Sequence, residues 1–223
     1  MTSPRTTHDV VVVGAGVIGT AVARACAQRG LDVALLDPRP GTGASYAAAG
    51  MLAPATEAHV GEESLLGLGL ASAARWPAFA AALTAETGAD TGWSDAGTVM
   101  VAADADDKRV LAQLHDFQTS LGLGTERLTS REVRSLEPLL SPEVVGGLSA
   151  PADHSVDNRR LMAVLATSAA AAGTTQVRGW VRGLLLDPDG SRAVGVVLDD
   201  GRTIGAGTVV LAGGARSGLL EGL

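Results

Sequence analysis

Apolar residues near the start of the chain follow two different periodicities. Asp9–Val13 ends in four valines, a continuous β-branched run that is typical of a strand covered on both faces of a parallel sheet. In Val17–Arg29 apolar residues recur at helical spacing, and Gly30 suits the C-terminal cap of that helix. Asp32–Leu36 is again strand-like. The pattern predicts a βαβ unit.

The middle of the chain mixes helical and strand-like segments. A helix-compatible, amphipathic stretch covers about Glu62–Thr87, and we expect it to bend or divide at Pro77. Trp93–Ala103 carries strand-like residues, whereas Ala105–Leu121 is helix-compatible. This mixture indicates an α+β region distinct from the first segment.

Two further helices are predicted from capping signals. Ser130–Leu136 is a short helix that we expect Ser130 to cap at its N-terminus, with Glu132 behind it. Asn158–Ala172 contains consecutive alanines of high helix propensity, and Gly173 ends it. This helix marks a return of the chain to the first domain.

The last part of the chain is rich in β-branched and aliphatic residues. Turn-forming sequences separate three runs of an antiparallel meander, Gln176–Leu186, Ala193–Leu198 and Arg202–Ile204. Thr208–Ala212 follows as another apolar strand that ends at glycine, as Asp9–Val13 does. We expect Thr208–Ala212 and Asp32–Leu36 to flank Asp9–Val13 as parallel neighbours.

Composition is that of a folded globular protein and disfavours nucleic acid as a partner. Hydrophobic residues make up 46% and charged residues 18% of the 223 positions, far from the signature of disorder. The net charge of -7 and the pI near 5.0 oppose binding to a phosphate backbone, and 3% aromatic residues offer no platform for base stacking.

Cysteine and histidine usage predicts neither a disulfide nor a metal site. The lone Cys26 has no internal disulfide partner, and we expect it to be buried as a small apolar side chain. The four histidines, His8, His59, His115 and His154, lack metal-ligand spacing. We therefore expect no metal and a cytoplasmic location.

Neither apolar stretch of the chain is expected to enter a membrane. Leu65–Leu83 is broken by Arg75 and Pro77 and falls short of the roughly 20 apolar residues that a span needs. Val10–Ala27 resembles a signal peptide, but glycines interrupt it at a nucleotide-binding spacing and a second strand follows. We expect no membrane segment and no signal peptide.

A glycine pattern lies between the first strand and the first helix, at Gly14-Ala15-Gly16-Val17-Ile18-Gly19. In this context Gly14 permits the tight turn, Gly16 lets a pyrophosphate approach the backbone, and Gly19 lets the helix pack close to the strand. The free N–H groups and the dipole at the helix N-terminus favour an anion there. The motif predicts a dinucleotide site.

An acidic residue ends the second strand. Asp37 stands near the roughly 20-residue offset from the glycines at which a carboxylate accepts hydrogen bonds from ribose hydroxyls. The acidic strand end argues against a 2′-phosphate, and Arg39 is expected to be a solvated surface residue. FAD and NAD both satisfy this pattern.

The segment Gly43–Met51 consists mainly of small residues, which allow a bulky ligand to approach the backbone of a loop. Together with G-A-G-V-I-G and Asp37, the sequence S-Y-A-A-A-G-M-L at Ser45–Leu52 resembles the D-amino-acid-oxidase-like flavoenzymes, especially the glycine oxidases of thiamine biosynthesis. Thr208–Gly214 resembles a Gly-ended strand of the same family. The resemblance runs along essentially the whole chain.

The resemblance implies FAD as the cofactor and an α/β fold. That fold is a Rossmann-like FAD-binding domain, with a parallel sheet and an antiparallel β-meander, formed by residues 1–58 and 153–223. Residues 59–152 would be an inserted α+β portion of the substrate domain. The flavin ring would lie nearest Ala49–Met51. By position, the family's FAD contacts fall on Gly14, Gly16, Val17, Ile18, Gly19, Asp37, Pro38, Ala44, Ser45, Ala49, Gly50, Met51 and, on the adenine side, Val181.

The resemblance also implies an FAD-dependent oxidoreductase whose substrate is a small amino acid or amine and whose oxidant is molecular oxygen. Glycine would be oxidised to an imine that hydrolyses to glyoxylate. The arginine that holds the substrate carboxylate lies, in the family, beyond the position matching Leu223, so no catalytic residue is assigned and the chain alone is expected to be inactive. The alternatives are a related D-amino-acid or sarcosine-like oxidase or dehydrogenase and a non-catalytic flavin-binding remnant. The full-length protein could form a homo-oligomer.

Overall fold

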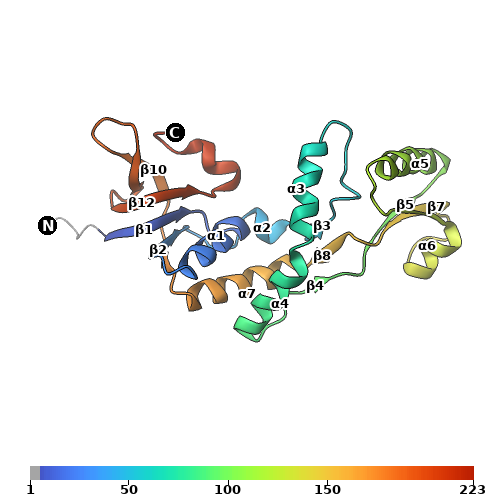
Figure 1. Ribbon diagram of the computed structural model, residues 1–223, viewed down its shortest axis with the longest axis horizontal. Helices are drawn as coiled ribbons and strands as arrows, with labels where there is room; N and C mark the ends of the chain where they lie inside the picture. Colours follow the sequence, from blue (N-terminus) through green and yellow to red (C-terminus); the bar gives the residue numbers. More distant parts are fainter. Residues whose placement is uncertain (1–5) are drawn as a thin grey trace. The chain divides into compact units, whose positions relative to one another are not determined.

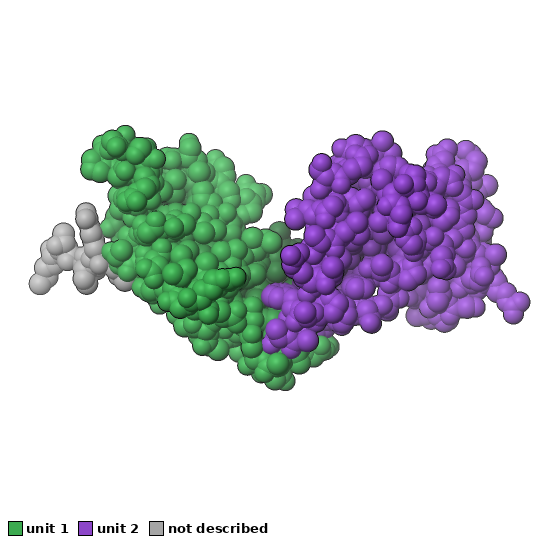
Figure 2. Space-filling model, viewed as in Figure 1, with its two compact units in different colours: residues 1–49, 83–91, 158–223 green, residues 50–82, 92–157 purple. Residues whose placement is uncertain are grey.

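The computed structural model describes residues 6–223 (Figure 1). The chain forms two compact units (Figure 2). Unit 1 contains residues up to 49 together with Leu83–Thr91 and Asn158–Leu223, and unit 2 contains Gly50–Ala82 and Gly92–Asp157. The domain boundaries expected after residues 58 and 152 stay a prediction.

Unit 1 is built on a six-stranded sheet with the order β10-β11-β12-β1-β2-β9. Its central strand β1 pairs in parallel with β12 on one side and with β2 on the other, which confirms the predicted arrangement and the α/β fold class. The strands are β1 Thr6–Val13, β2 Val33–Leu36, β9 Thr175–Val177, β10 Val181–Leu186, β11 Ala193–Leu198 and β12 Thr203–Leu211.

The end of the chain differs from the predicted meander in two ways. The run Gln176–Leu186 is divided, because β9 pairs in parallel with β2 and only β10 joins the antiparallel meander. In addition, β12 is one continuous strand, where two strands separated near Gly205 and Gly207 were expected. A Cβ atom on Gly205 would lie 2.9 Å from Thr7 Oγ1, so this glycine serves close approach to β1.

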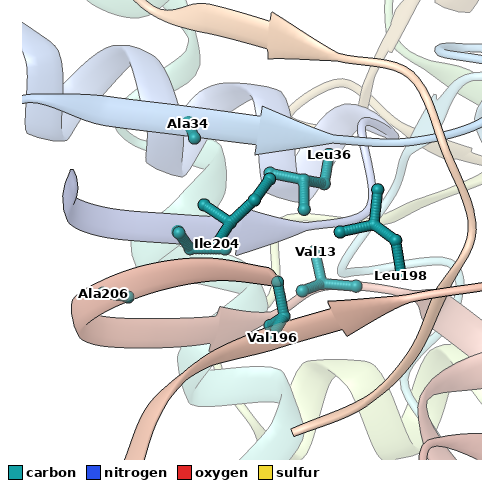
Figure 3. Packing of buried hydrophobic residues seen from close by; sticks show 8 residues of the cluster. Val13, Ala34, Leu36, Val196, Leu198, Ile204 and Ala206 are labelled. Carbon is teal, nitrogen blue, oxygen red and sulfur yellow. The ribbon is translucent and has the colours of Figure 1, made fainter. Parts of the chain in front are cut away.

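The valines of β1 alternate between two hydrophobic clusters, as the covering of both sheet faces predicts. Val11 and Val13 pack with Leu36 and Leu198 in one cluster (Figure 3). Val12 belongs to the other cluster, which is covered by helix α1 (Val17–Ala27). Helix α7 (Asn158–Ala171) packs against α1. Each buried aliphatic side chain contributes about 1.5–3 kcal/mol, so the strand carrying the glycine turn is firmly anchored.

Unit 2 contains two small antiparallel sheets and several helices. The first sheet has the order β3-β8-β4 and the second the order β5-β7-β6. Helix α6 is capped by Thr129, which accepts a hydrogen bond from the Glu132 N–H in a capping box, so the expected cap at Ser130 is wrong by one residue. The elements are β3 Met51–Leu52, α3 Glu63–Ala73, β4 Trp93–Ser94, β5 Thr98–Ala102, α5 Ala105–Ser120, β6 Glu126–Thr129, α6 Ser130–Leu136, β7 Gly146–Ala150 and β8 His154–Val156.

The apolar stretch Glu63–Thr87 is divided into α3 and helix α4 (Trp76–Thr87), but the division lies at Ala74 and Arg75 rather than at Pro77, where it was expected. Pro77 lies in the first turn of α4, where its missing N–H costs no intrahelical bond. Within the described residues, this stretch is long and apolar enough to cross a membrane by length and composition alone, with a mean hydropathy of 1.2. Arg75 separates its two helices, and the expectation of no membrane segment stays a prediction.

Candidate functional site

The glycine turn after β1 requires its glycines for steric reasons. Gly14 has a φ of 103°, and a Cβ atom there would lie 2.4 Å from the Ala212 carbonyl oxygen. A Cβ atom on Gly19 would lie 1.8 Å from the Gly14 carbonyl oxygen. The tight turn and the close approach of helix to strand therefore follow as predicted, and the turn presents its backbone at the start of α1.

Helix α1 begins with features that suit an anion. Its N-cap is Gly16, which has no side chain to cap the helix, and the first turn contains no acidic residue. The Val17 N–H donates to Ser45 Oγ at 2.9 Å, and the neighbouring Ile18 side chain is 67% exposed. Because the first-turn N–H groups of a helix have no intrahelical acceptors and lie at the positive end of its dipole, this end fits a pyrophosphate.

Asp37 follows β2 and lies beside the glycine turn. Its Oδ2 atom accepts a hydrogen bond from the Ala15 N–H at 2.8 Å, and its Oδ1 atom accepts one from the Arg39 N–H at 2.7 Å. A carboxylate has about four acceptor positions, so both oxygens can also accept from ribose hydroxyls. The bond to Ala15 ties the end of β2 to the glycine turn. The sequence did not predict this second role of Asp37.

The small-residue segment contains a helical turn where a loop was expected. Ala44 and Ser45 lie in α2 (Ala44–Ala47), which is consistent with the high helix propensity of alanine. Asn158, at the start of α7, donates from Nδ2 to the Ser45 carbonyl at 2.7 Å and to the Tyr46 carbonyl at 2.9 Å. These bonds tie α2 to the start of α7, while Ser45 Oγ contacts α1. No local sequence pattern predicts this role of Asn158.

The residues expected nearest the flavin ring continue from Ala49 into unit 2. Gly50 has a φ of 80°, and its carbonyl accepts a hydrogen bond from the Val156 N–H at 2.8 Å. Met51 is 52% exposed and pairs with Ser155 between β3 and β8. Ala49 is also exposed. Ala49 and Met51 are thus accessible here, as contact with a bulky ring requires.

Two further predicted contacts are Pro38 and Val181. Pro38 follows Asp37 and is partly buried. Val181 begins β10, and β11 and β12 lie between that strand and β1. The structure brings together Gly14, Gly16, Gly19, Val17, Asp37 and Ser45. Val181 packs against the hydrophobic cluster that contains Val13 and Leu36, and its adenine contact stays a prediction.

Unit 2 also contains a cavity of about 480 Å³, and Leu52, the residue after Met51, is part of its lining. Its walls are mainly apolar and include Leu66 and Trp76, while Glu57 and Glu62 supply negative charge. In the described part of the chain, no group of three or more His, Cys, Asp or Glu residues is arranged to hold a metal ion. The cavity is therefore suited to an organic ligand with an apolar portion.

The family model described as "DAO: FAD dependent oxidoreductase" matches residues 9–223. The chain belongs to this family. This membership confirms the predicted flavoenzyme resemblance and FAD as the cofactor.

Among relatives of this FAD dependent oxidoreductase, the glycine oxidase of Geobacillus kaustophilus is 36% identical, over 93% of this chain and 55% of the relative. The bifunctional protein ThiO/ThiG of Synechocystis is 32% identical over 95% of this chain and 30% of its own length. The crystal structure of the Geobacillus kaustophilus glycine oxidase superposes with a TM-score of 0.87 at 34% identity, covering 96% of this chain and 57% of that one. The chain thus spans about half the length of the glycine oxidases it matches.

The residues present fit FAD. Gly14 and Gly19 permit the tight turn and the close approach of α1 to it, the N-terminus of α1 is suited to the pyrophosphate, and Asp37 offers acceptors to the ribose. Together these residues form the proposed binding site for the nucleotide end of FAD. The assignment of each contact to a particular part of FAD stays a prediction.

Proposed function

We propose that this chain is the FAD-binding part of a glycine oxidase. The similarity to named glycine oxidases supports the substrate class, and the observation that carries the proposal is the glycine turn with Asp37 hydrogen-bonded to its backbone. In the complete protein, glycine, oxygen and water would yield glyoxylate, ammonia and hydrogen peroxide, as a step in thiamine biosynthesis. A cytoplasmic location and a homo-oligomer of the complete protein belong to the same proposal.

The protein's task in this reaction is binding and orientation. FAD, when bound, supplies the redox chemistry by accepting a hydride from the substrate α-carbon and passing the electrons to oxygen. The N-terminus of α1 holds the pyrophosphate, and Asp37 holds the ribose. Ala49 and Gly50 would offer backbone and little side-chain bulk to the flavin ring, and Met51 would offer a flexible apolar side chain. Docking of the substrate carboxylate calls for a bidentate arginine, which the family resemblance places outside this chain.

We expect the purified chain of residues 1–223 to produce no glycine-dependent hydrogen peroxide, even with excess FAD. The reason is that it spans 55% of the related Geobacillus kaustophilus enzyme and lacks the arginine that the resemblance assigns to substrate docking. The measurement is a coupled peroxide assay with glycine, with that enzyme as the positive control. A turnover close to the control would show that the substrate site lies within these residues and has been misassigned.

The contribution of Asp37 to FAD binding is directly testable. Asp37→Ala removes charge-assisted hydrogen bonds worth about 1.5–3 kcal/mol, so we expect FAD affinity to fall roughly 10- to 150-fold. Arg39→Ala, two residues away on the exposed side of the same turn, is the control and is expected to change affinity less than about threefold. Flavin fluorescence titration of both variants measures the effect, and the opposite order of affinities would contradict the ribose assignment.

A second candidate function is oxidation of a larger amine or D-amino acid. The observation that favours it is the apolar cavity lined in part by Leu52, which offers more room than glycine needs. The complete protein, assayed with glycine, sarcosine and a series of D-amino acids, separates these candidates by kcat/KM. A third candidate, a flavin-binding protein without catalysis, predicts FAD binding with no turnover of any of these amines.

A further inference from the structure

A fully buried carboxylate lies within unit 2, directly before β8. Asp153 is 0% exposed. Its Oδ1 atom accepts a hydrogen bond from the Ala55 N–H at 2.9 Å. Its Oδ2 atom accepts from both the N–H and the hydroxyl of Thr56, each at 2.8 Å. One side chain therefore satisfies three donors of a segment almost a hundred residues earlier in the chain.

The segment that Asp153 holds, Ala55 and Thr56, follows β3, whose Met51 is a proposed contact of the flavin ring. β3 pairs with β8, and the Val156 N–H donates to the Gly50 carbonyl at 2.8 Å. At the far end of the segment, the buried Gln118 donates from Nε2 to the Ala55 carbonyl at 2.7 Å. Gly50–Thr56 is thus fixed by β8 at its beginning and by the Asp153 and Gln118 side chains at its end.

Burial makes this arrangement demanding. A carboxyl group that leaves water loses solvation, and the loss is offset only when its lone pairs meet well-placed donors. Asp153 meets three such donors within 3 Å, and removing it would leave two buried N–H groups without that acceptor. The backbone after Met51 therefore has one strongly preferred path, which is what precise contact with a flat ring requires.

We propose that Asp153 is a positioning residue for the flavin ring: it fixes the path of Gly50–Thr56 and so sets where Gly50 and Met51 meet the isoalloxazine. This inference rests on the proposed FAD contact of those two residues. It assigns to Asp153 an effect on the flavin end of the cofactor that is separate from the adenosine and pyrophosphate contacts of Asp37 and the glycine turn.

The test compares FAD with ADP, which lacks the flavin. In the purified chain, Asp153→Asn replaces an acceptor oxygen by an amide that faces a donor, and we expect FAD affinity to fall about tenfold while ADP affinity changes less than about twofold. The visible absorption bands of bound FAD should also shift. Asp116→Asn, an exposed aspartate of the same unit paired with Arg127, is the matched control and should change neither affinity.

A second variant guards against misfolding of Asp153→Asn. Thr56→Val removes only the hydroxyl bond to Asp153 and is expected to reduce FAD affinity about threefold, again without affecting ADP. Equal losses of FAD and ADP affinity in the variants, or unchanged FAD affinity and spectrum, would overturn the positioning role. A wild-type chain that binds neither ligand would overturn the proposed function as well, and is distinguished by the wild-type titration alone.

Discussion

Replacing Gly19 by alanine is expected to lower the free energy of unfolding of unit 1 by at least about 3 kcal/mol and to abolish measurable FAD binding. The added Cβ atom would lie 1.8 Å from the Gly14 carbonyl oxygen and 3.2 Å from Ala212 Cβ. The first of these is a backbone atom, so no flexible side chain can move aside. Helix α1 must then shift away from the turn, and the N–H groups proposed to bind the pyrophosphate shift with it.

The matched control for this variant is Gly67→Ala. Gly67 lies inside helix α3, as Gly19 lies inside α1, but a Cβ atom there would meet no atom within 4 Å. Alanine is the better helix former, so this variant is expected to be more stable by up to about 1 kcal/mol. Urea unfolding and flavin fluorescence measure both variants, and a Gly19→Ala chain with wild-type stability and FAD affinity would contradict the packing described here.

The features that sequence could predict are those written in short stretches of neighbouring residues. β1, α1 and β2 follow from local apolar periodicity, and the glycine spacing between them carries its own steric reason. Asp37 was predictable because it ends a strand at a fixed offset from that motif. The parallel pairing of β12 with β1 followed from its continuous apolar run, since such strands are covered on both faces.

Other features depend on pairs that are far apart in the chain and leave no periodic signal. Asp153 bonds to Ala55, and Asn158 bonds to Ser45 across 113 positions. Before the fold is known, a single Asp or Asn at a strand or helix start cannot be told from a solvated surface residue. The predicted break in β12 was wrong for a related reason. Gly205 suggests a turn when only its neighbours in sequence are considered, but it allows close packing against β1.

The same limitation concealed a buried ion pair in unit 1. Arg24 of α1 is 8% exposed. Its guanidinium bonds to the Glu86 carboxylate through Nε and Nη2, and its Nε also donates to Ser168 Oγ at 2.6 Å. Ser168 in turn donates to Glu86. Within unit 1 these bonds connect α1, the end of α4 and α7. The N-terminus of α1 is the one proposed to bind FAD.

Breaking this pair is expected to destabilise unit 1 strongly. Glu86→Gln keeps the shape of the side chain but removes the negative charge that Glu86 presents to the buried Arg24. Fully buried pairs lose roughly 3–5 kcal/mol in such cases. Because the Glu86 side chain is 33% exposed, solvent screens part of this, and we expect about 2–3 kcal/mol. The control is Glu221→Gln, which breaks the exposed pair with Arg182 and should cost less than about 1 kcal/mol.

The free-energy difference between the wild-type chain and Glu86→Gln should depend on pH with a definite sign. Hydrogen bonds from Arg24, and then from Ser168, hold the pKa of the Glu86 carboxyl below its ordinary value of 4.5. A carboxyl whose pKa is depressed by folding stabilises the protein above that ordinary value, and the contribution is lost as the pH falls through the lowered pKa. Urea unfolding should therefore give a constant difference from about pH 7 to about pH 5 and a shrinking one below it. Since the amide introduced by Glu86→Gln carries no titrating proton, a difference that widened on acidification would show that the ionised carboxylate does not stabilise this helix junction.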